Sequence, residues 1–326
     1  MKALVTGANG FIGSHLVELL RKRNCAVRCL VRRTSDTRWL KGIEVEYVYG
    51  DLFDEAALRT AVTGTDLVFH SAGLTKAKTR EGYYRANTEG TRNLLRACRT
   101  HNPGLKRFVQ ISSLAAAGPA TGDVPVTEEM PPRPITTYGK SKLEAERECL
   151  ALSRDLPVTI LRPPAVYGPR DKDVFEFFHT VSRGLQPMVG FGKKEVSLIH
   201  VADLVRGFLT AAEHPAAAGG TYFITSPRAY SWEEIGNVTR AVLRKRALRI
   251  RIPVFGVYTI AAVAELLALF SSKPALINFE KARDMVQDRW TCNPARAERE
   301  LGFRAEIGLG EGIQNTVAWC REQGWL

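Results

Sequence analysis

The sequence lacks the cysteine and histidine patterns that mark disulfide-rich or metal-binding proteins. Its six cysteines form no C-x-x-C pair, and they form no metal-ligand cluster with the six histidines. They are typical of reduced thiols, so we expect a cytoplasmic protein without a metal site. Gly7 and Gly10 interrupt the early apolar stretch, and we therefore expect no signal peptide.

Acidic residues are fewer than basic ones. The chain has 46 Lys and Arg against 34 Asp and Glu, which gives a formal net charge of +12 over 326 residues. The basic residues are scattered, however, without interleaved aromatic residues or a DNA- or RNA-binding motif. We therefore expect no nucleic-acid partner and interpret the charge as a solvated face that attracts anionic cofactors. The length suits one large α/β unit or two coupled ones.

A glycine-rich segment near the N-terminus is the most informative motif. The apolar run at 3–5 predicts a buried strand, and the periodic run from Phe11 predicts a helix. Gly7, Gly10 and Gly13 lie between or within them, in the spacing G-x-x-G-x-x-G. Glycine lets the backbone turn tightly and approach a ligand, while the helix N-terminus offers unpaired N–H groups to an anion. This order favours a dinucleotide pyrophosphate cradle over a plain structural turn.

Short β-branched and aromatic runs then alternate with helix-like segments. The expected strands are Ala26–Val31, Glu44–Tyr49, Asp66–His70, Arg107–Ile111 and Val158–Leu161, and the expected helices include Glu55–Val62, Ala86–Thr100 and Lys140–Ser153. The alternation predicts the α/β class, with a Rossmann-type doubly wound parallel sheet covered on both faces.

After Arg162 the alternation loosens, and helix signals predominate. Ser231-x-x-Glu234 is a capping box, and Asn293-Pro294 with Gly302 gives start and stop signals for another helix. We expect a smaller, mostly helical C-terminal substrate lobe formed by residues 166–195 and 223–326. Residues 1–165 would form the dinucleotide-binding domain, to which 196–222 would return.

No acid ends the second expected strand, where NAD-binding units often carry a carboxylate for the ribose 2′-hydroxyl. Arg32 and Arg33 stand there, and their guanidinium groups suit a 2′-phosphate. We therefore favour NADP(H) over NAD(H), with plain surface arginines as the alternative. Asp51, followed by Leu52, comes after the third strand and could accept a hydrogen bond from the adenine amino group. Alternatively, Asp51 ends the strand or caps the next helix.

Tyr138 and Lys142 form a candidate proton-transfer pair. They are four residues apart in an expected helix and therefore share one face. A tyrosine of pKa near 10 is a poor acid or base at neutral pH, and a neighbouring ammonium should lower that pKa. Y-x-x-x-K occurs by chance on helix surfaces, but here Ser112-Ser113 also ends the fifth strand. The combination predicts proton exchange with a substrate oxygen.

The chain resembles the extended short-chain dehydrogenases/reductases of the NAD-dependent epimerase/dehydratase superfamily. The matching segments are Thr6–Gly13, Phe69–Gly73, Asn87–Thr91, Ser112-Ser113, Tyr138–Lys142, Arg162–Arg170 and His200–Asp203. The resemblance implies hydride transfer at nicotinamide C4, with Ser113 holding the substrate oxygen and Tyr138 as the acid/base. Lys142 would bind the nicotinamide ribose and tune the tyrosine. The implied cofactor site comprises Gly7, Asn9, Gly10, Phe11, Ile12, Gly13, Ser71, Ala72, Gly73, Lys142, Pro164 and Val166.

Two departures from the family pattern narrow the expected substrate. Sugar-nucleotide dehydratases carry an Asp-Glu pair directly after the catalytic hydroxyl residue, where this chain has Leu114 and Ala115. Sugar-nucleotide epimerases usually place an arginine four residues before the histidine of the H-V-x-D segment. That position is Val196 here, and an aliphatic side chain cannot hold a diphosphate. Arg170 remains, but one arginine does not specify a nucleotide sugar.

One long apolar run, residues 252–270, contains the single charge Glu265 and follows a basic run from Arg244 to Arg251. Its length is borderline for a membrane span, which needs about 20 residues. We expect a buried helix that walls an apolar substrate pocket. The sequence allows two further partners. Residues 244–270 could contact a membrane surface, and the protein could form a homodimer. His200 and Asp203 are expected to anchor a helix start.

These features are similar to the 3β-hydroxysteroid dehydrogenase and dihydroflavonol reductase branches, whose substrates are hydrophobic ketones or alcohols. The sequence therefore predicts an NADP(H)-preferring oxidoreductase that interconverts a ketone and a secondary alcohol on a largely apolar small molecule. One alternative is a sugar-nucleotide epimerase that holds NAD tightly. The other is a non-catalytic redox-sensing or scaffold protein on the same fold.

Overall fold

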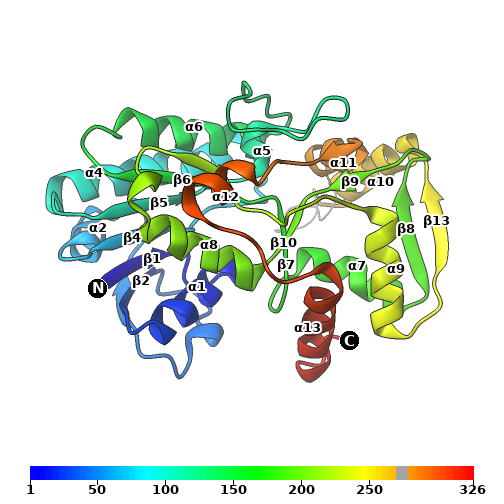
Figure 1. Ribbon diagram of the computed structural model, residues 1–326, viewed down its shortest axis with the longest axis horizontal. Helices are drawn as coiled ribbons and strands as arrows, with labels where there is room; N and C mark the ends of the chain where they lie inside the picture. Colours follow the sequence, from blue (N-terminus) through cyan, green and yellow to red (C-terminus); the bar gives the residue numbers. More distant parts are fainter. Residues whose placement is uncertain (269–277) are drawn as a thin grey trace.

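The computed structural model describes residues 1–268 and 278–326, and a parallel sheet of seven strands lies at its centre (Figure 1). The strand order is β11-β6-β5-β4-β1-β2-β3. The strands are β1 (Lys2–Thr6), β2 (Ala26–Val31), β3 (Glu46–Tyr49), β4 (Leu67–His70), β5 (Arg107–Ile111), β6 (Val158–Arg162) and β11 (Thr221–Phe223). Order and direction confirm the predicted Rossmann-type, doubly wound sheet.

Alternation along the central strand explains why helices cover both faces of the sheet. Ala3 and Val5 face a core formed with α1 (Phe11–Lys22) and α8 (Val201–Glu213). Leu4 points to the opposite face, into a core shared with α2 (Glu55–Val62), α4 (Gly90–His101) and α6 (Thr137–Ala151). All three side chains are fully buried. Because successive strand residues alternate between faces, a continuous apolar strand needs a helix layer on each side.

Element bounds agree best where the local signals are strong. β2, β5 and α2 have the predicted bounds, and the other predicted strands shift by one or two residues. The expected helix 86–100 is instead a succession of α3 (Arg80–Tyr84), a π-helical turn (Arg85–Glu89) and α4. α6 begins three residues earlier than predicted, because the Thr136 side chain accepts a hydrogen bond from the Gly139 N–H and caps it.

The C-terminal region is helical, as predicted, with small sheets between the helices. A separate core joins α7 (Asp173–Ser182), α9 (Trp232–Leu243) and α13 (Leu309–Glu322). The remaining helices are α5 (Leu114–Ala117), α10 (Val254–Ala268), α11 (Phe279–Val286) and α12 (Ala295–Leu301). The small sheets pair β7 (Ala165–Tyr167) with β10 (Leu198–His200), β8 (Leu185–Val189) with β13 (Leu248–Ile252), and β9 (Glu195–Val196) with β12 (Tyr230–Ser231) and β14 (Arg289–Trp290).

The helix signals of this region are confirmed. The Ser231 hydroxyl accepts from the Glu234 N–H at 3.1 Å and caps α9. The Glu234 carboxylate pairs with Arg228, so only one half of the predicted capping box forms. Gly302 ends α12 in the left-handed conformation, at φ 62°. All six cysteines are buried thiols.

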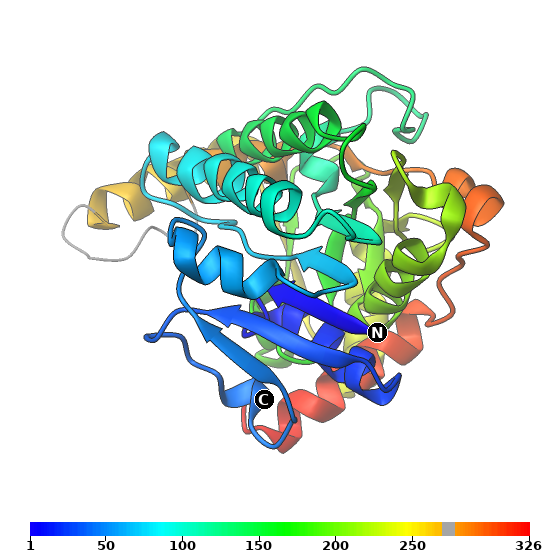
Figure 2. The same ribbon diagram turned by 90° about the vertical axis from the view of Figure 1, so that its left-hand side faces the viewer.

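The prediction of a buried helix at 252–270 is wrong. Ile252 ends β13, and α10 packs mainly against α11, burying Val257 and Ala261. Phe255 is 74% exposed and Leu267 is 66% exposed. Figure 2 shows α10 projecting from the left-hand side of the body. Positions 269 and 270 of the run lie outside the described residues. No helix among the described residues is long and apolar enough to span a membrane.

Candidate active site

The N-terminal glycines form a cradle that side chains would obstruct. Gly7 has φ +69°, and a Cβ there would lie 2.7 Å from the Ala72 nitrogen. A Cβ on Gly13 would lie 2.1 Å from the Gly7 oxygen, so only glycine lets α1 approach the end of β1. Gly10 precedes α1, which has no side-chain cap and no acid in its first turn. Its N–H groups therefore suit a dinucleotide pyrophosphate, and the residues present fit this cofactor.

The other predicted cofactor residues line the same carboxyl edge of the sheet. Thr6 ends β1, and it accepts hydrogen bonds from the backbone N–H groups of Ser71 and Ala72, each at 3.2 Å. Gly73 follows, and a Cβ there would lie 2.9 Å from Asn87 Oδ1. The half-buried or exposed residues at this edge are Asn9, Phe11, Ile12 and Val166, and Pro164 is buried beyond β6.

At the expected adenosine end, Arg32 and Arg33 are exposed directly after β2, and the Arg33 guanidinium lies over the Tyr49 ring at 5.1 Å. Asp36 is the acid nearest in sequence. Its carboxylate is already paired with Arg38 at 2.5 Å, and its hydrogen bonds to Arg38 lower its pKa. The Arg32 side chain has no hydrogen-bond or ion-pair partner within residues 1–268 and 278–326, so its guanidinium group faces solvent beside the end of β2.

Asp51 is exposed, and its carboxylate accepts from the Phe53 N–H at 2.8 Å. It does not cap the following helix. Asp54 takes that role instead, because its carboxylate accepts from the Ala57 N–H at 2.9 Å. Leu52 lies against Gly90 of α4, where a Cβ would meet its Cδ1 at 2.8 Å.

Ser113 and Tyr138 lie where α5 and α6 approach each other closely, since a Cβ on Gly139 would lie 2.2 Å from the Ala115 oxygen. Ser113 ends the segment after β5, while the Thr136 cap places Tyr138 in the first turn of α6. Burial raises the pKa of Tyr138 to about 12, although the Ser113 side chain opposes this rise. The expected lowering by Lys142 is therefore wrong for this structure. Desolvation of the phenolate outweighs every favourable interaction.

Lys142 is buried one helical turn further along α6. Its Nζ donates to the Ile111 carbonyl at the end of β5, at 2.6 Å. Burial lowers its pKa to about 8, and the negative charge of Glu146 counteracts part of this shift. A Cβ on Gly73 would lie 3.9 Å from Nζ, so Lys142 also lies close to the cofactor loop after β4.

A buried ion pair, which the sequence analysis did not identify, lies one helical turn after Lys142. Glu146 binds Arg162 through two hydrogen bonds, of 2.9 Å to Nε and 2.6 Å to the terminal nitrogen. The Ser112 hydroxyl donates to the same carboxylate at 2.5 Å. The spacing Lys142-x-x-x-Glu146 was a usable signal, because it places both side chains on one helix face.

His70 is another buried polar group that was not singled out. Its ring lies between the hydroxyls of Thr6, at 2.7 Å from Nδ1, and Thr91, at 2.9 Å from Nε2. The Thr91 hydroxyl donates to the Asn87 carbonyl, so Nε2 must carry the ring proton and Nδ1 must accept from Thr6. Burial lowers the pKa of His70 to about 3, which keeps the ring neutral.

The positions that depart from the family pattern are not free to bind a diphosphate. Val196 is buried in β9, and Leu114 lies in a small core beneath α5. The Arg170 guanidinium pairs with Glu18, donates to Ser14 and lies over the Trp39 ring.

His200 and Asp203 have the predicted structural roles. The His200 Nδ1 accepts from the Ala202 N–H and caps α8. The Asp203 carboxylate accepts from the backbone N–H groups of Glu306 and Ile307, at 3.0 and 2.8 Å, and so holds the segment before α13. In residues 1–268 and 278–326, no group of acidic, cysteine and histidine side chains could hold a metal ion.

Comparison with known proteins agrees with this geometry. The sequence profile of the NAD dependent epimerase/dehydratase family matches residues 3–225. The chain is 32% identical over 324 residues to a ceramide reductase of Caulobacter vibrioides (strain NA1000 / CB15N), covering 99% of this chain and 95% of that one. It is 28% identical over 340 residues to sterol demethylase protein B of Methylococcus capsulatus (strain ATCC 33009 / NCIMB 11132 / Bath), covering all of both chains.

The fold also matches a solved structure of MoeE5 in complex with UDP-glucuronic acid and NAD. The TM-score is 0.79 at 28% identity, over 99% of this chain and 100% of that one. Sequence profile, full-length relatives and fold thus point to the same family. The chain is an enzyme of the extended short-chain dehydrogenase/reductase type and belongs to the NAD dependent epimerase/dehydratase family.

Proposed function

We propose that this enzyme interconverts a ketone and a secondary alcohol on a largely apolar small molecule, with NADP(H) preferred as cofactor. The observation that carries the proposal is the close approach of α5 and α6, which brings Ser113 and Tyr138 to the carboxyl edge of the sheet beside the glycine cradle. Two neighbouring hydroxyls can both interact with one substrate oxygen.

The cofactor, when bound, supplies or accepts a hydride at its nicotinamide. The remaining chemistry falls to the protein. In the reducing direction Ser113 donates a hydrogen bond to the carbonyl oxygen and orients it. Tyr138, whose pKa is raised to about 12, stays protonated at neutral pH and gives its proton to the developing alkoxide. Lys142, held by the Ile111 carbonyl beside the loop after β4, would bind the nicotinamide ribose.

Three observations support an apolar substrate. Val196 and Leu114 occupy the positions where sugar-nucleotide enzymes of this family carry charged groups, and both are buried in cores. Arg170 is already neutralised by Glu18. Two of the relatives carry names of lipids, a ceramide and a sterol. The competing proposal is sugar-nucleotide epimerisation. The similarity of the fold to MoeE5 in complex with UDP-glucuronic acid and NAD supports it.

Support for NADP(H) comes from the end of β2. Arg32 and Arg33 are exposed there, and the nearby Asp36 is paired with Arg38. A 2′-phosphate would therefore meet guanidinium groups without facing an unpaired carboxylate. We also propose that residues 1–165 and 196–222 form the cofactor unit, with 166–195 and 223–326 as the substrate lobe. The pairing of β11 with β6 and the packing of α8 on the sheet support this division.

The function is tested with NADPH and two substrate classes. We expect an apolar long-chain or polycyclic ketone to be reduced with equal consumption of NADPH, measured by nicotinamide absorbance. Tyr138→Phe should reduce turnover below about a tenth while leaving NADPH affinity unchanged. Saturable binding of UDP-glucose in calorimetric titration, together with copurified NAD, would instead favour the epimerase. Absence of turnover with both classes would favour a non-catalytic protein.

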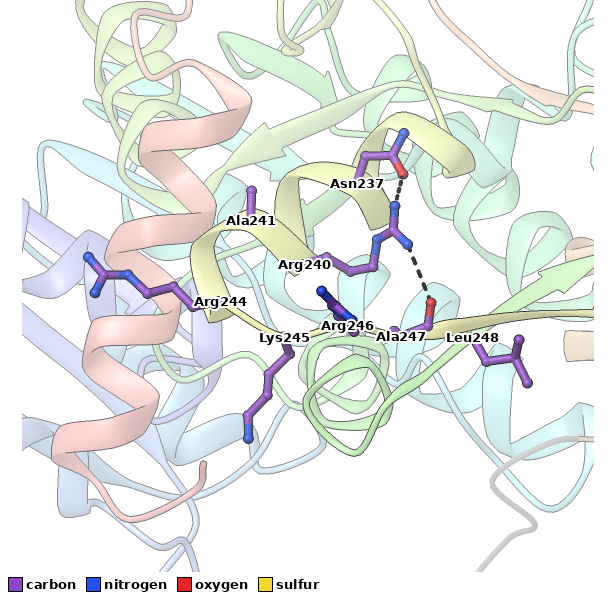
Figure 3. A pocket seen from close by; sticks show the side chains of 8 residues that line it. All are labelled: Asn237, Arg240, Ala241, Arg244, Lys245, Arg246, Ala247 and Leu248. Atoms are coloured by element: carbon purple, nitrogen blue, oxygen red, sulfur yellow. Dashed lines mark hydrogen bonds between the residues drawn. The ribbon is translucent and has the colours of Figure 1, made fainter.

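We further propose that α10 and β13 bind the surface of an anionic membrane. Apolar side chains are exposed on both elements: Leu248, Ile250, Phe255, Ile260, Val263, Leu266 and Leu267. A basic segment directly precedes them. Arg244, Lys245 and Arg246 line a shallow surface hollow of about 780 Å³ with Arg240 and Leu248 (Figure 3).

The basic side chains that line the hollow differ in how they are held. Arg240 donates hydrogen bonds to Asn237 and the Ala247 carbonyl, whereas Arg244 and Lys245 extend away from it (Figure 3). An apolar surface flanked by cations matches the hydrocarbon boundary and the anionic headgroups of a bilayer, and such a contact would deliver a lipid-like ketone to the enzyme.

Co-sedimentation tests this contact. The protein should sediment with vesicles containing phosphatidylglycerol and much less with pure phosphatidylcholine. Phe255→Ser with Leu267→Ser should abolish binding, whereas Val124→Ser, an exposed apolar residue outside this surface, should not. Unchanged vesicle binding by the double variant would refute the proposal. A homodimer in sedimentation equilibrium that this variant dissociates would show instead that a second copy covers the surface.

A further inference from the structure

Asp284 presents a buried carboxylate oxygen that no described residue satisfies. Its Oδ1 is inaccessible to solvent and has no hydrogen-bond partner among the residues that the structure describes. Leaving an acceptor of this kind unpaired costs about 1–3 kcal/mol, and more for a charged group. Buried unpaired polar groups are uncommon in folded proteins, so the position of this one is informative.

The unpaired carboxylate lies on α11, the helix that contacts the backbone directly before Tyr138. Its negative charge contributes to the raised pKa of Tyr138, and it acts in the same direction on Tyr83. The rings of Tyr83 and Tyr138 are themselves neighbours, with centroids 6.4 Å apart. Glu280 and Asp284 are four residues apart on α11 and share one face, and Glu280 contacts the Thr137 N–H next to Tyr138, so Asp284 lies on the face of α11 that is directed toward the start of α6.

The surrounding contacts hold Asp284 in place. It lies on α11, which Figure 1 shows between α5 and α10. The Glu280 carboxylate accepts from the Thr137 N–H at the start of α6, and Arg283 donates to the Ile135 carbonyl at 3.1 Å. Trp290 Nε1 donates to the backbone carbonyl of Asp284 at 2.9 Å. α11 is thus fastened to the segment that carries Tyr138.

The charges nearest to Asp284 do not satisfy Oδ1. Lys281 and Arg283 lower its pKa through space, but burial is the larger effect and raises the pKa to about 6. The group is therefore mainly ionised at neutral pH and retains full capacity to accept hydrogen bonds. A donor that arrives with the substrate would remove the penalty of the unpaired oxygen.

We propose that Asp284 Oδ1 accepts a hydrogen bond from a hydroxyl or N–H group that the substrate carries beside its reacting carbonyl. The substrate class is then an apolar ketone with a neighbouring hydroxyl or amide, rather than a plain ketone. This inference rests on the proposed ketone–alcohol function and adds a specificity-determining residue to it. A site with a dedicated polar partner discriminates strongly against an analogue that lacks the matching group.

The test compares two long-chain ketones of equal length, one with an amide N–H on the neighbouring carbon and one without. For wild type we expect kcat/KM to favour the amido-ketone by about 100-fold or more. Asp284→Leu should reduce this ratio to below about tenfold. Asp284→Asn keeps an acceptor but removes its charge, so its ratio should fall by about tenfold. Asp288→Leu is the control, because that carboxylate is exposed and its partner Lys194 also donates to the Val286 and Gln287 carbonyls.

An unchanged ratio in a folded Asp284→Leu variant would overturn the inference. Circular dichroism establishes folding, and if Asp284→Leu does not fold, the ratio of Asp284→Asn decides in the same way. A wild-type ratio near one would also overturn it, because the two ketones would then be used alike. Failure of the proposed function is distinguishable, since wild type would then reduce neither ketone.

Discussion

The buried pair between Glu146 and Arg162 offers the sharpest test of how the site is supported. The two side chains are 2% and 6% exposed, and the carboxylate accepts from Arg162 twice and from Ser112 once. In Glu146→Gln, the amide can no longer offer two anionic oxygens to the guanidinium. Arg162 would keep its charge in a buried position without a counter-charge.

We expect Glu146→Gln to lower the free energy of unfolding by about 3–5 kcal/mol, which is the usual cost of leaving one partner of a buried pair. The same helix supplies a control. Glu144 and Arg147 pair at 2.5 Å but are 39% and 63% exposed, so Glu144→Gln should change stability by less than about 0.5 kcal/mol. Urea unfolding followed by fluorescence measures both values.

A second variant separates charge from packing. Glu146→Leu with Arg162→Met removes both charges and keeps similar volume, so it should be more stable than Glu146→Gln. If Glu146→Gln were no more destabilising than Glu144→Gln, the pair would not be desolvated in solution. If the double variant were no better than the single one, packing rather than an uncompensated charge would explain the loss. Either result would refute the reasoning.

Three further predictions concern the cofactor and pH. Alanine at both Arg32 and Arg33 should weaken NADPH binding by about 1–3 kcal/mol and spare NADH, and equal losses for the two cofactors in calorimetry would contradict the 2′-phosphate assignment. Gly13→Ala should abolish cofactor binding, because its Cβ would lie 2.1 Å from the Gly7 oxygen, whereas Gly310→Ala should not, since a Cβ there meets nothing within 4 Å. Between about pH 6.5 and 3, the free energy of unfolding should decrease as pH falls. In this range His70 takes up a proton in the unfolded chain but stays neutral in the folded protein, where its pKa is about 3. His70→Gln should flatten this slope in acid unfolding, and an unaltered slope would mean that other groups cause it.

Local sequence patterns predicted much of the sheet. β2 and α2 have the expected bounds because strand alternation and helix caps act over a few residues. The predicted start of α6 was three residues too late, because the hydrogen bond from the Gly139 N–H to the Thr136 side chain begins the helix earlier. That single contact decides where Tyr138 lies relative to Ser113. The sequence therefore predicted candidate catalytic residues but not the geometry between them.

Contacts between distant segments explain what the sequence could not show. The apolar run at 252–270 predicted a core helix. Apolar composition indicates that a segment favours a nonpolar environment, but it does not indicate which surface provides that environment. Asp284 carries no local motif, and its meaning depends on α11 being fastened to the start of α6. The raised pKa of Tyr138 results mainly from burial, which depends on the folded structure and could not be predicted from the local sequence.

The π-helical turn at Arg85–Glu89 makes the site sensitive to chain length. Such a turn contains one more residue than an α-helix of the same rise, so it behaves as a built-in insertion between α3 and α4. Deleting one residue there would restore a continuous helix and rotate α3 by roughly 100° relative to α4. Tyr83 would then swing away from Tyr138, and Asn87 would leave Gly73. Substitution of the exposed Arg85 should be tolerated far better than a deletion, because the number of residues in the turn sets the alignment of the two helices.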